Sequence, residues 1–376
     1  ILAVALVAAV LPAAAADNFP TKPVRMIVPF SPGSASDFLA RAIGQKVSET
    51  WGHQLIVDNR PGGGGVVGAA IGKATRIDDA RGRYIEYAKQ SLGDMSLQGM
   101  SIVLDCGHGA GYMLAPLIFR ELGAKVRKLG VEPDGTNIND GCGALHPEHA
   151  GQAVRETGAD LGVSLDGDAD RVIFTDRTGA TVSGDRILAL CALALAEEGR
   201  LKNRTMACTV MSNLGLHEAM RRAGISVVTT PVSDRHVIEA LRAGGHSFGG
   251  ENSGHLIFAD HATTGDGIMS ALQVLRFMRC KGASLSELAA CMDEYPQKLI
   301  NLKVSARRPL AELPRLQERL READAAFGRD GRHLIRYSGT ESKLRILVEH
   351  RDAGEAERWS AAFVKAVEED FSEVRA

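Results

Sequence analysis

The sequence predicts an α/β protein built of consecutive α/β domains, with a small α+β domain at its carboxyl end. From about residue 73 onward, short apolar runs alternate with glycine turns and helical stretches, which is typical of βαβ units. From residue 296 onward the order changes to strand, helix, strand, strand, helix, which indicates a separate α+β domain. The 376 residues are 45% hydrophobic and 24% charged, a composition that supports about two to four domains with real cores.

Charge and cysteine content narrow the classes of partner and compartment. The formal net charge is −2 at pH 7, so no overall field attracts nucleic acid or an anionic membrane, and we expect neither as a stable partner. The six cysteines form no C-x-x-C pair, which favours reduced thiols in a cytoplasmic protein over a disulfide framework or a zinc site. They are Cys106, Cys142, Cys191, Cys208, Cys280 and Cys291.

The first sixteen residues indicate a different compartment. Residues 1–16 are all apolar and end in a run of alanines, which is typical of the apolar core and cleavage site of a secretory signal. The segment is too short for a membrane span, and Pro12 would interrupt a spanning helix. A buried N-terminal helix is the alternative, but length and flanks favour the signal, so this segment argues for export.

Residues 17–72 form one predicted unit. Val24–Phe30 is predicted as a strand, and the turn Pro32–Asp37 contains helix-capping residues that begin a helix ending near residue 49. Gln54–Val57 is a second predicted strand, and the glycine-rich loop Asn59–Gly65 leads into another helix.

The segments VPFSPGSASD and NRPGGGG of this unit resemble the start of the periplasmic tripartite tricarboxylate receptor family. The resemblance implies that the loop after the first strand holds a small carboxylate, through the matching residues Ser34, Ser36 and Asp37. It covers only about 55 residues, and the second lobe of that family has no counterpart in this sequence. A βαβ fragment without an active ligand site is therefore the preferred interpretation.

A glycine loop follows the first strand of the next predicted unit. Ser101–Asp105 is predicted as a strand, Gly107–Gly111 as the loop, and Lys125–Leu129 as the next strand after an intervening helix. Tyr112 stands where the third glycine of G-x-G-x-x-G belongs, which favours a tight turn over a dinucleotide site. The predicted segments of the whole chain are 1–16, 17–72, 73–183, 184–295 and 296–376.

Three carboxylates alternate along the loop Asp166-Gly167-Asp168-Ala169-Asp170-Arg171, which lies between two apolar runs that predict strands. Like charges this close repel and raise each other's pKa, and a divalent cation removes that cost. Carboxylate oxygens are hard ligands, so the loop predicts a Mg²⁺ site. An EF-hand would need Gly and Glu where Arg171 and Arg177 stand, and the flanking strands disfavour a solvated acidic turn.

Two later loops carry groups that suit a sugar phosphate. In the loop Gly249–His255, Glu251 and Ser253 could bind sugar hydroxyls, and His255 could move a proton or contact phosphate. The alternative is a surface turn with a spectator histidine. The segment Arg336–Arg345 brackets a hydroxyl-rich turn with two arginines, a combination that suits a phosphate group.

In order and spacing, these three loops resemble the α-D-phosphohexomutase superfamily, over about 300 residues. The segments TNINDGCGALHPE (136–148), TVMSNLGLH (209–217) and TTGDGI (263–268) favour its phosphoglucosamine mutase branch over the phosphomannomutase/phosphoglucomutase branch. The resemblance implies consecutive phosphohexomutase-type domains, the second to fourth of the family, preceded here by the receptor-like βαβ fragment.

The resemblance also implies a reaction and a site. The reaction interconverts glucosamine 6-phosphate and glucosamine 1-phosphate through glucosamine 1,6-bisphosphate, with Mg²⁺ placed between a phosphoserine and the acidic loop. The implied metal ligands are Asp166, Asp168 and Asp170, and the implied catalytic residues are Arg171 and His255. The implied substrate-binding residues are Glu251, Ser253, Arg336, Ser338, Gly339, Thr340 and Arg345.

The donor serine of that family has no counterpart in this sequence. The family carries it in a Thr/Ser-Ala-Ser-His-Asn-Pro loop, whereas Ser34-Ala35-Ser36 is followed here by Asp37-Phe38, and the join between the two parts lies near Gly72-Lys73. We therefore expect binding of sugar phosphate and Mg²⁺ with little or no turnover, and an exposed apolar face where the first domain would pack. A phosphomannomutase/phosphoglucomutase, an exported solute-binding protein and a non-catalytic sugar-phosphate-binding module are the alternatives.

Overall fold

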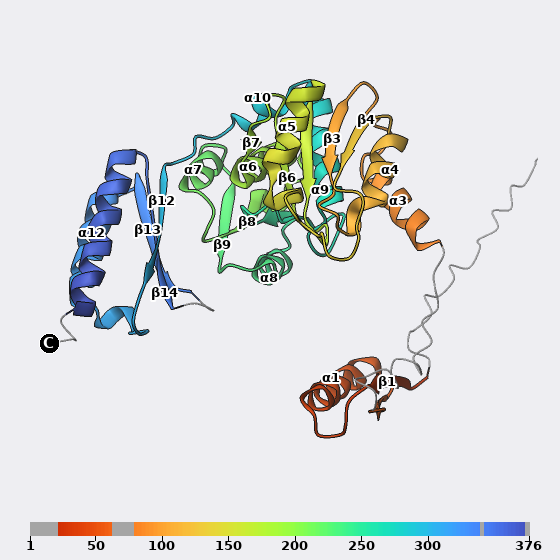
Figure 1. Cartoon of the computed structure of the whole chain (residues 1–376), viewed down its shortest axis with the longest axis horizontal. Helices are drawn as coiled ribbons and strands as arrows, with labels where there is room; N and C mark the ends of the chain where they lie inside the picture. The colour runs from red at the N-terminus through yellow and green to blue at the C-terminus, as the bar shows by residue number, and fades with distance from the viewer. Residues whose placement is uncertain (1–21, 62–78, 339–341, 373–376) are drawn as a thin grey trace, which may run out of the picture. The chain divides into compact units, whose positions relative to one another are not determined.

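The computed structural model describes residues 22–61, 79–338 and 342–372, and the chain divides into two units, residues 1–79 and 80–376 (Figure 1). The first unit contains strand β1 (Val24–Val28), helix α1 (Ala35–Trp51) and strand β2 (Leu55–Asn59). The strands pair in parallel, as a βαβ pattern predicts. The signal-like segment 1–16, the glycine loop from residue 62 and the join near residue 72 lie outside the described residues.

Helix α1 begins and ends where its sequence predicts. The Ser34 side chain accepts a hydrogen bond from the Asp37 amide at the N-terminus, and Gly52 ends the helix in the left-handed conformation. The core of this unit is small: Val28 and Ala40 are buried, whereas Phe38 is 77% exposed.

The second unit begins with helix α3 (Ala80–Gln90) and a five-stranded sheet in the order β4-β3-β5-β6-β7. The strands β4, β3 and β5 pair in parallel. The pairs β5–β6 and β6–β7 are antiparallel. Its elements are β3 (Ser101–Asp105), α4 (Leu114–Glu121), β4 (Lys125–Leu129), α5 (Pro147–Thr157), β5 (Leu161–Leu165), β6 (Val172–Thr175) and β7 (Thr181–Val182).

The chain passes from β3 to β4 on one side of the sheet and returns to β5 on the other side of β3. The loops that leave the carboxyl ends of β3 and β5 therefore lie next to each other, which is where ligands bind in open α/β sheets. The acidic loop is one of these two loops.

A four-stranded sheet follows, in the order β11-β10-β8-β9. Its elements are α6 (Gly184–Glu197), β8 (Thr205–Thr209), α7 (Leu214–Arg222), β9 (Ser226–Thr230), α8 (Asp234–Gly244), β10 (Phe248–Gly250), β11 (Leu256–Phe258), α9 (Gly267–Lys281) and α10 (Leu285–Ala289). Helices α6 and α9 are buried along most of their length, and one continuous hydrophobic core runs through both sheets. Among the described helices, none is long and apolar enough to cross a membrane.

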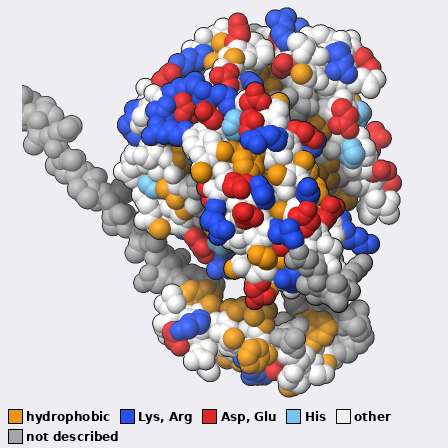
Figure 2. Space-filling model, turned by 90° about the vertical axis from the view of Figure 1, so that its left-hand side faces the viewer, with side chains coloured by type: hydrophobic (Ala, Val, Ile, Leu, Met, Phe, Trp, Pro, Cys, Tyr) orange, Lys and Arg blue, Asp and Glu red, His pale blue; other side chains and the backbone are white. Residues whose placement is uncertain are grey.

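The last part has its own core, which contains Phe327, Trp359 and Phe363. Its antiparallel sheet has the order β12-β14-β13, and the predicted order of elements is confirmed. The elements are β12 (Gln297–Lys303), α11 (Pro314–Phe327), β13 (Gly331–Tyr337), β14 (Lys343–His350) and α12 (Ala353–Ser372). On the face of the molecule shown in Figure 2, acidic and basic side chains are interspersed rather than gathered into a patch of one sign.

Candidate active site

The acidic loop joins β5 to β6, as the two apolar runs predict, and its two ends are tied together. The Arg171 amide donates to Asp166 Oδ1 over 3.0 Å, and Ala169 adopts φ +61°, which lets the chain reverse within six residues. Gly167 packs against the segment 136–148: a Cβ atom there would lie 2.6 Å from Ile138 Cδ1. A side chain at this position would therefore require the Ile138 side chain, which is 56% exposed, to move.

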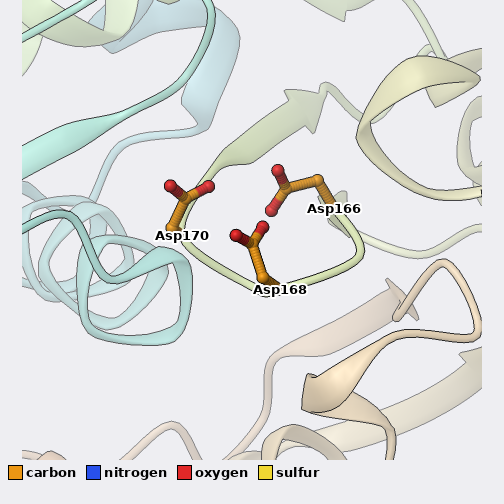
Figure 3. Close-up of side chains that lie close together, drawn as sticks. All are labelled: Asp166, Asp168 and Asp170. Carbon is orange, nitrogen blue, oxygen red and sulfur yellow. The ribbon is translucent and has the colours of Figure 1, made fainter. Parts of the chain in front are cut away.

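The three carboxylates converge on the inside of this loop (Figure 3). One oxygen from each of Asp166, Asp168 and Asp170 lies within 4.8 Å of the others. Burial raises the pKa of Asp166, and the nearby carboxylates of Asp170 and Asp168 raise it further. Closely spaced oxygen donors with excess negative charge fit a hard divalent cation such as Mg²⁺, which would relieve the repulsion between them.

Two cationic or ionisable groups border the carboxylates. Arg171 Nε lies 2.8 Å from Asp166 Oδ2 and 3.4 Å from Asp170 Oδ1. His255 Nδ1 lies 3.2 Å from Asp170 Oδ2, although His255 follows a different strand in the second sheet. The imidazole is buried, and its Nε2 has no hydrogen-bond partner among the described residues. It sits over Gly265, where a Cβ atom would come within 2.4 Å of Nε2.

The loop Gly249–His255, here called the sugar loop, is connected to the acidic loop through the backbone. The Gly254 carbonyl accepts a hydrogen bond from the Val172 amide, one residue beyond the acidic loop. Glu251 Oε1 accepts from the Ser233 amide over 3.0 Å, and Ser253 Oγ lies 3.5 Å from Glu251 Oε2. The structure therefore brings the sugar loop, with Glu251, Ser253 and His255, next to the acidic loop.

The expected phosphate-binding residues lie in the C-terminal domain. Arg336 on β13 stands directly opposite Arg345 on β14, so two guanidinium groups share one end of the sheet. The Ser338 amide donates to the Lys343 carbonyl, which closes the turn between the strands. Gly339 and Thr340 lie outside the described residues.

Sequence reasoning gave no role to Tyr84 or Asp266. The Tyr84 hydroxyl donates to the Asp266 carboxylate, at 3.0 and 2.9 Å from its two oxygens, and the next residue, Gly267, donates its amide to the Ala169 carbonyl of the acidic loop. A cavity of about 260 Å³ beside the carboxylates is lined in part by Tyr84, Asp168, Asp170 and Asp266. The segment TTGDGI drew attention to Asp266, but no local motif marks Tyr84.

Family models of phosphoglucomutase/phosphomannomutase match three consecutive segments of the chain. The alpha/beta/alpha domain II matches residues 82–179, the alpha/beta/alpha domain III residues 183–295, and the C-terminal domain residues 299–366.

Curated relatives at about half identity are named phosphoglucosamine mutase. The Geobacter sp. (strain M21) protein is 50% identical over 80% of this chain and 66% of its own length, and the Pelobacter propionicus protein is 49% identical over 81% and 67%. The chain thus spans about two thirds of the length of these relatives. Among solved structures, Aspergillus fumigatus N-acetylphosphoglucosamine mutase, in complex with GlcNAc-6P and magnesium, has a TM-score of 0.64 at 19% identity, covering 94% of this chain and 78% of that one, which bears on the fold alone.

Proposed function

The chain belongs to the phosphoglucomutase/phosphomannomutase family, and from this premise we propose that its site serves a magnesium-dependent interconversion of glucosamine 6-phosphate and glucosamine 1-phosphate. The observation that carries the proposal is the convergence of Asp166, Asp168 and Asp170, bordered by Arg171 and His255 and joined to the sugar loop. The relatives named phosphoglucosamine mutase support the amino sugar as substrate.

Each group has a chemical role in this proposal. Asp166, Asp168 and Asp170 hold Mg²⁺, which when bound neutralises charge on the phosphoryl group in transfer. Arg171, anchored to Asp166 through Nε, adds a second positive charge beside that group. His255 is bound to Asp170 through Nδ1, and its proposed role is to move a proton or contact phosphate, which requires its buried Nε2 to become accessible.

The substrate spans two loops. Glu251 and Ser253 bind sugar hydroxyls, and the phosphate that does not react is bound by Arg336, Ser338, Gly339, Thr340 and Arg345. Glucosamine 1,6-bisphosphate is the proposed intermediate, because each turnover passes one phosphoryl group to the sugar and takes the other back.

The phosphoryl donor is the part of the machinery that this sequence does not supply. No Ser-His-Asn-Pro segment occurs in the 376 residues, and we propose that residues 17–72 are a receptor-like fragment ahead of mutase domains at 73–183, 184–295 and 296–376. The chain alone then binds sugar phosphate and Mg²⁺ but turns over poorly or not at all. The mutase portion belongs in the cytoplasm, whereas the signal-like residues 1–16 argue for export.

The test is a pair of measurements on the purified chain with Mg²⁺. Calorimetric titration with glucosamine 6-phosphate should show binding, and an assay for glucosamine 1-phosphate with a trace of the bisphosphate should show little product. Absence of binding by the folded chain would overturn the proposed function. Turnover typical of an intact mutase would instead show that another residue donates the phosphoryl group. Glucose 6-phosphate and mannose 6-phosphate, titrated in parallel, test the alternative branch of the family.

A further inference from the structure

The junction between the domain of the sugar loop and the C-terminal domain is held by several polar contacts. Asn213 makes two hydrogen bonds with the backbone of Tyr295, at 3.0 and 2.9 Å. These bonds fix the start of the linker, residues 295–296, which leads from one domain into the other. The Tyr295 hydroxyl lies 2.8 Å from an Arg351 nitrogen, and the His350 amide donates to the Pro296 carbonyl. The linker is therefore hydrogen-bonded both to the domain of the sugar loop and to the C-terminal domain.

Arg332 makes a direct bridge across this junction. It stands opposite Glu349 in the β13–β14 pair, and its Nε donates to the Glu349 carboxylate. A terminal nitrogen of the same guanidinium donates to the carbonyl of Ser212, in the loop after β8. Glu349 is fully buried, and the Arg332 side chain is 23% exposed. Hydrogen bonds from a charged guanidinium to a buried carboxylate and a carbonyl are strong, and they fix the direction of both partners.

The bridge is continuous with both substrate-binding loops. On one side, Arg332 lies on the same strand as Arg336, four residues before it. On the other side, Ser212 follows Met211, whose carbonyl accepts a hydrogen bond from the Asn252 side chain over 3.4 Å. Asn252 lies between Glu251 and Ser253 in the sugar loop. A short run of contacts therefore connects β13, the strand that enters the segment Arg336–Arg345 (here called the phosphate loop), to the sugar loop.

We propose that Arg332 is a positioning residue, which fixes the C-terminal domain against the sugar-loop domain by binding Glu349 and the Ser212 carbonyl with one guanidinium. Its effect on ligand affinity rests on the proposed function. A sugar phosphate touches both loops, so its affinity depends on how the two domains are held relative to each other. Inorganic phosphate bound at the phosphate loop contacts the C-terminal domain alone, so its affinity there does not depend on the bridge.

The test variant removes both members of the ion pair, Arg332→Met with Glu349→Gln. Removing only one would leave a buried charge unpaired and could unfold the domain, whereas replacing both is commonly tolerated. The matched control is Arg329→Met, which deletes an exposed arginine of the same domain. Circular dichroism establishes that both variants are folded.

A distance measurement tests the positioning directly. One spin label is attached to Cys280, which is exposed, and one to Lys365→Cys on α12, in a Cys291→Ser background. The other four cysteines are buried. Pulsed electron paramagnetic resonance should give a narrow distance distribution for the parent and the control, and a shifted or broadened one for the double variant. An unchanged distribution in the double variant overturns the proposal.

The affinity measurement separates positioning from general damage. In the double variant, glucosamine 6-phosphate should bind about tenfold more weakly, while inorganic phosphate binds as in the parent. Equal loss for both ligands overturns the positioning role, because it means that the phosphate loop itself is disturbed. If the parent chain does not bind glucosamine 6-phosphate, the proposed function fails, and the distance distribution alone decides the role of Arg332.

Discussion

Two acidic sites of this chain each follow a strand, but the pKa shifts of their carboxylates are opposite. In the first turn of α1, Asp37 Oδ2 accepts from the Gly33 amide over 2.8 Å, and Oδ1 lies 3.0 Å from Arg41 Nε. These two interactions lower the pKa of Asp37 to about 2. In the acidic loop, burial and two neighbouring carboxylates instead raise the pKa of Asp166.

The contrast separates a carboxylate with a cationic partner in its own helix from a group of carboxylates that we propose as metal ligands. The charge of Asp37 is balanced by the Gly33 amide and by the ion pair with Arg41, both close to the start of α1, so it helps to build this helix. The acidic loop gathers three carboxylates beside one arginine, a balance that a bound cation would correct. A negative charge at Asp37 also disfavours a carboxylate ligand, which supports the interpretation of residues 17–72 as a fragment without an active site.

The largest expected difference between the two units lies in their cores. Phe277 on α9 is 1% exposed within the shared core, whereas Phe38 on α1 is 77% exposed. Phe277→Ala should lower the free energy of unfolding by about 3–5 kcal/mol, because it leaves a cavity, and Phe38→Ala should change it by no more than about 0.5 kcal/mol. Urea unfolding followed by circular dichroism measures both. Similar losses for the two variants would mean that the α1 face is covered in solution.

Local patterns predicted the elements of the site better than its assembly. The apolar runs on either side of Asp166–Arg171 predicted β5 and β6, and they placed the three carboxylates on the loop between them. The end of β8 is not marked by its sequence, because β8 ends at Thr209 although the apolar residues Val210 and Met211 continue the run. There the Met211 amide donates to the Thr209 hydroxyl instead of a neighbouring strand.

Contacts between distant residues could not be read from the sequence. Tyr84 and Asp266 are 182 residues apart, and Arg332 and Ser212 are 120 apart. No periodicity or spacing encodes such pairs, since they arise only when the sheets and helices pack. The family resemblance implied a catalytic role for His255 but not its contact with Asp170; that contact, and the space that Gly265 leaves for the imidazole, appear only in the fold.

Metal binding tests the contrast between the two acidic loops most directly. Asp168→Asn removes one charged oxygen donor from the triad and should weaken Mg²⁺ binding by roughly ten- to a hundredfold, a loss at least as large as that seen for residues that only support metal ligands. Asp37→Asn should leave the affinity unchanged. Isothermal titration of the two variants and the parent measures this. A comparable loss from Asp37→Asn, with the second unit folded, would place a cation site in the first unit and break the contrast.

Asp185 is, like Asp37, a carboxylate near the start of a helix. Asp37 and Asp185 both lie in the first turn of a helix capped by a serine, Ser34 or Ser183. Burial, with Glu349 and Glu294 nearby, raises the pKa of Asp185 to about 6, whereas the pKa of Asp37 is about 2. The shifts are opposite because the Gly33 amide and Arg41 stabilise the charged form of Asp37, whereas Asp185 lies deep in the fold, with Glu349 and Glu294 nearby and no cation as a partner among the causes of its shift.

The sign of this shift fixes the pH dependence. The folded state keeps a proton on Asp185 between about pH 4 and pH 6 that the unfolded chain has lost, so the stability contributed by this group falls as pH rises through that window. Asp185→Asn removes the titrating group, so the stability of the variant relative to the parent should rise by about 2 kcal/mol between pH 4 and pH 8. The buried amide also costs desolvation, but this cost is the same at every pH and does not change that rise. Urea unfolding of both proteins at pH 4, 5, 6 and 8 measures the difference, and a gain independent of pH would assign it to packing rather than to the carboxylate.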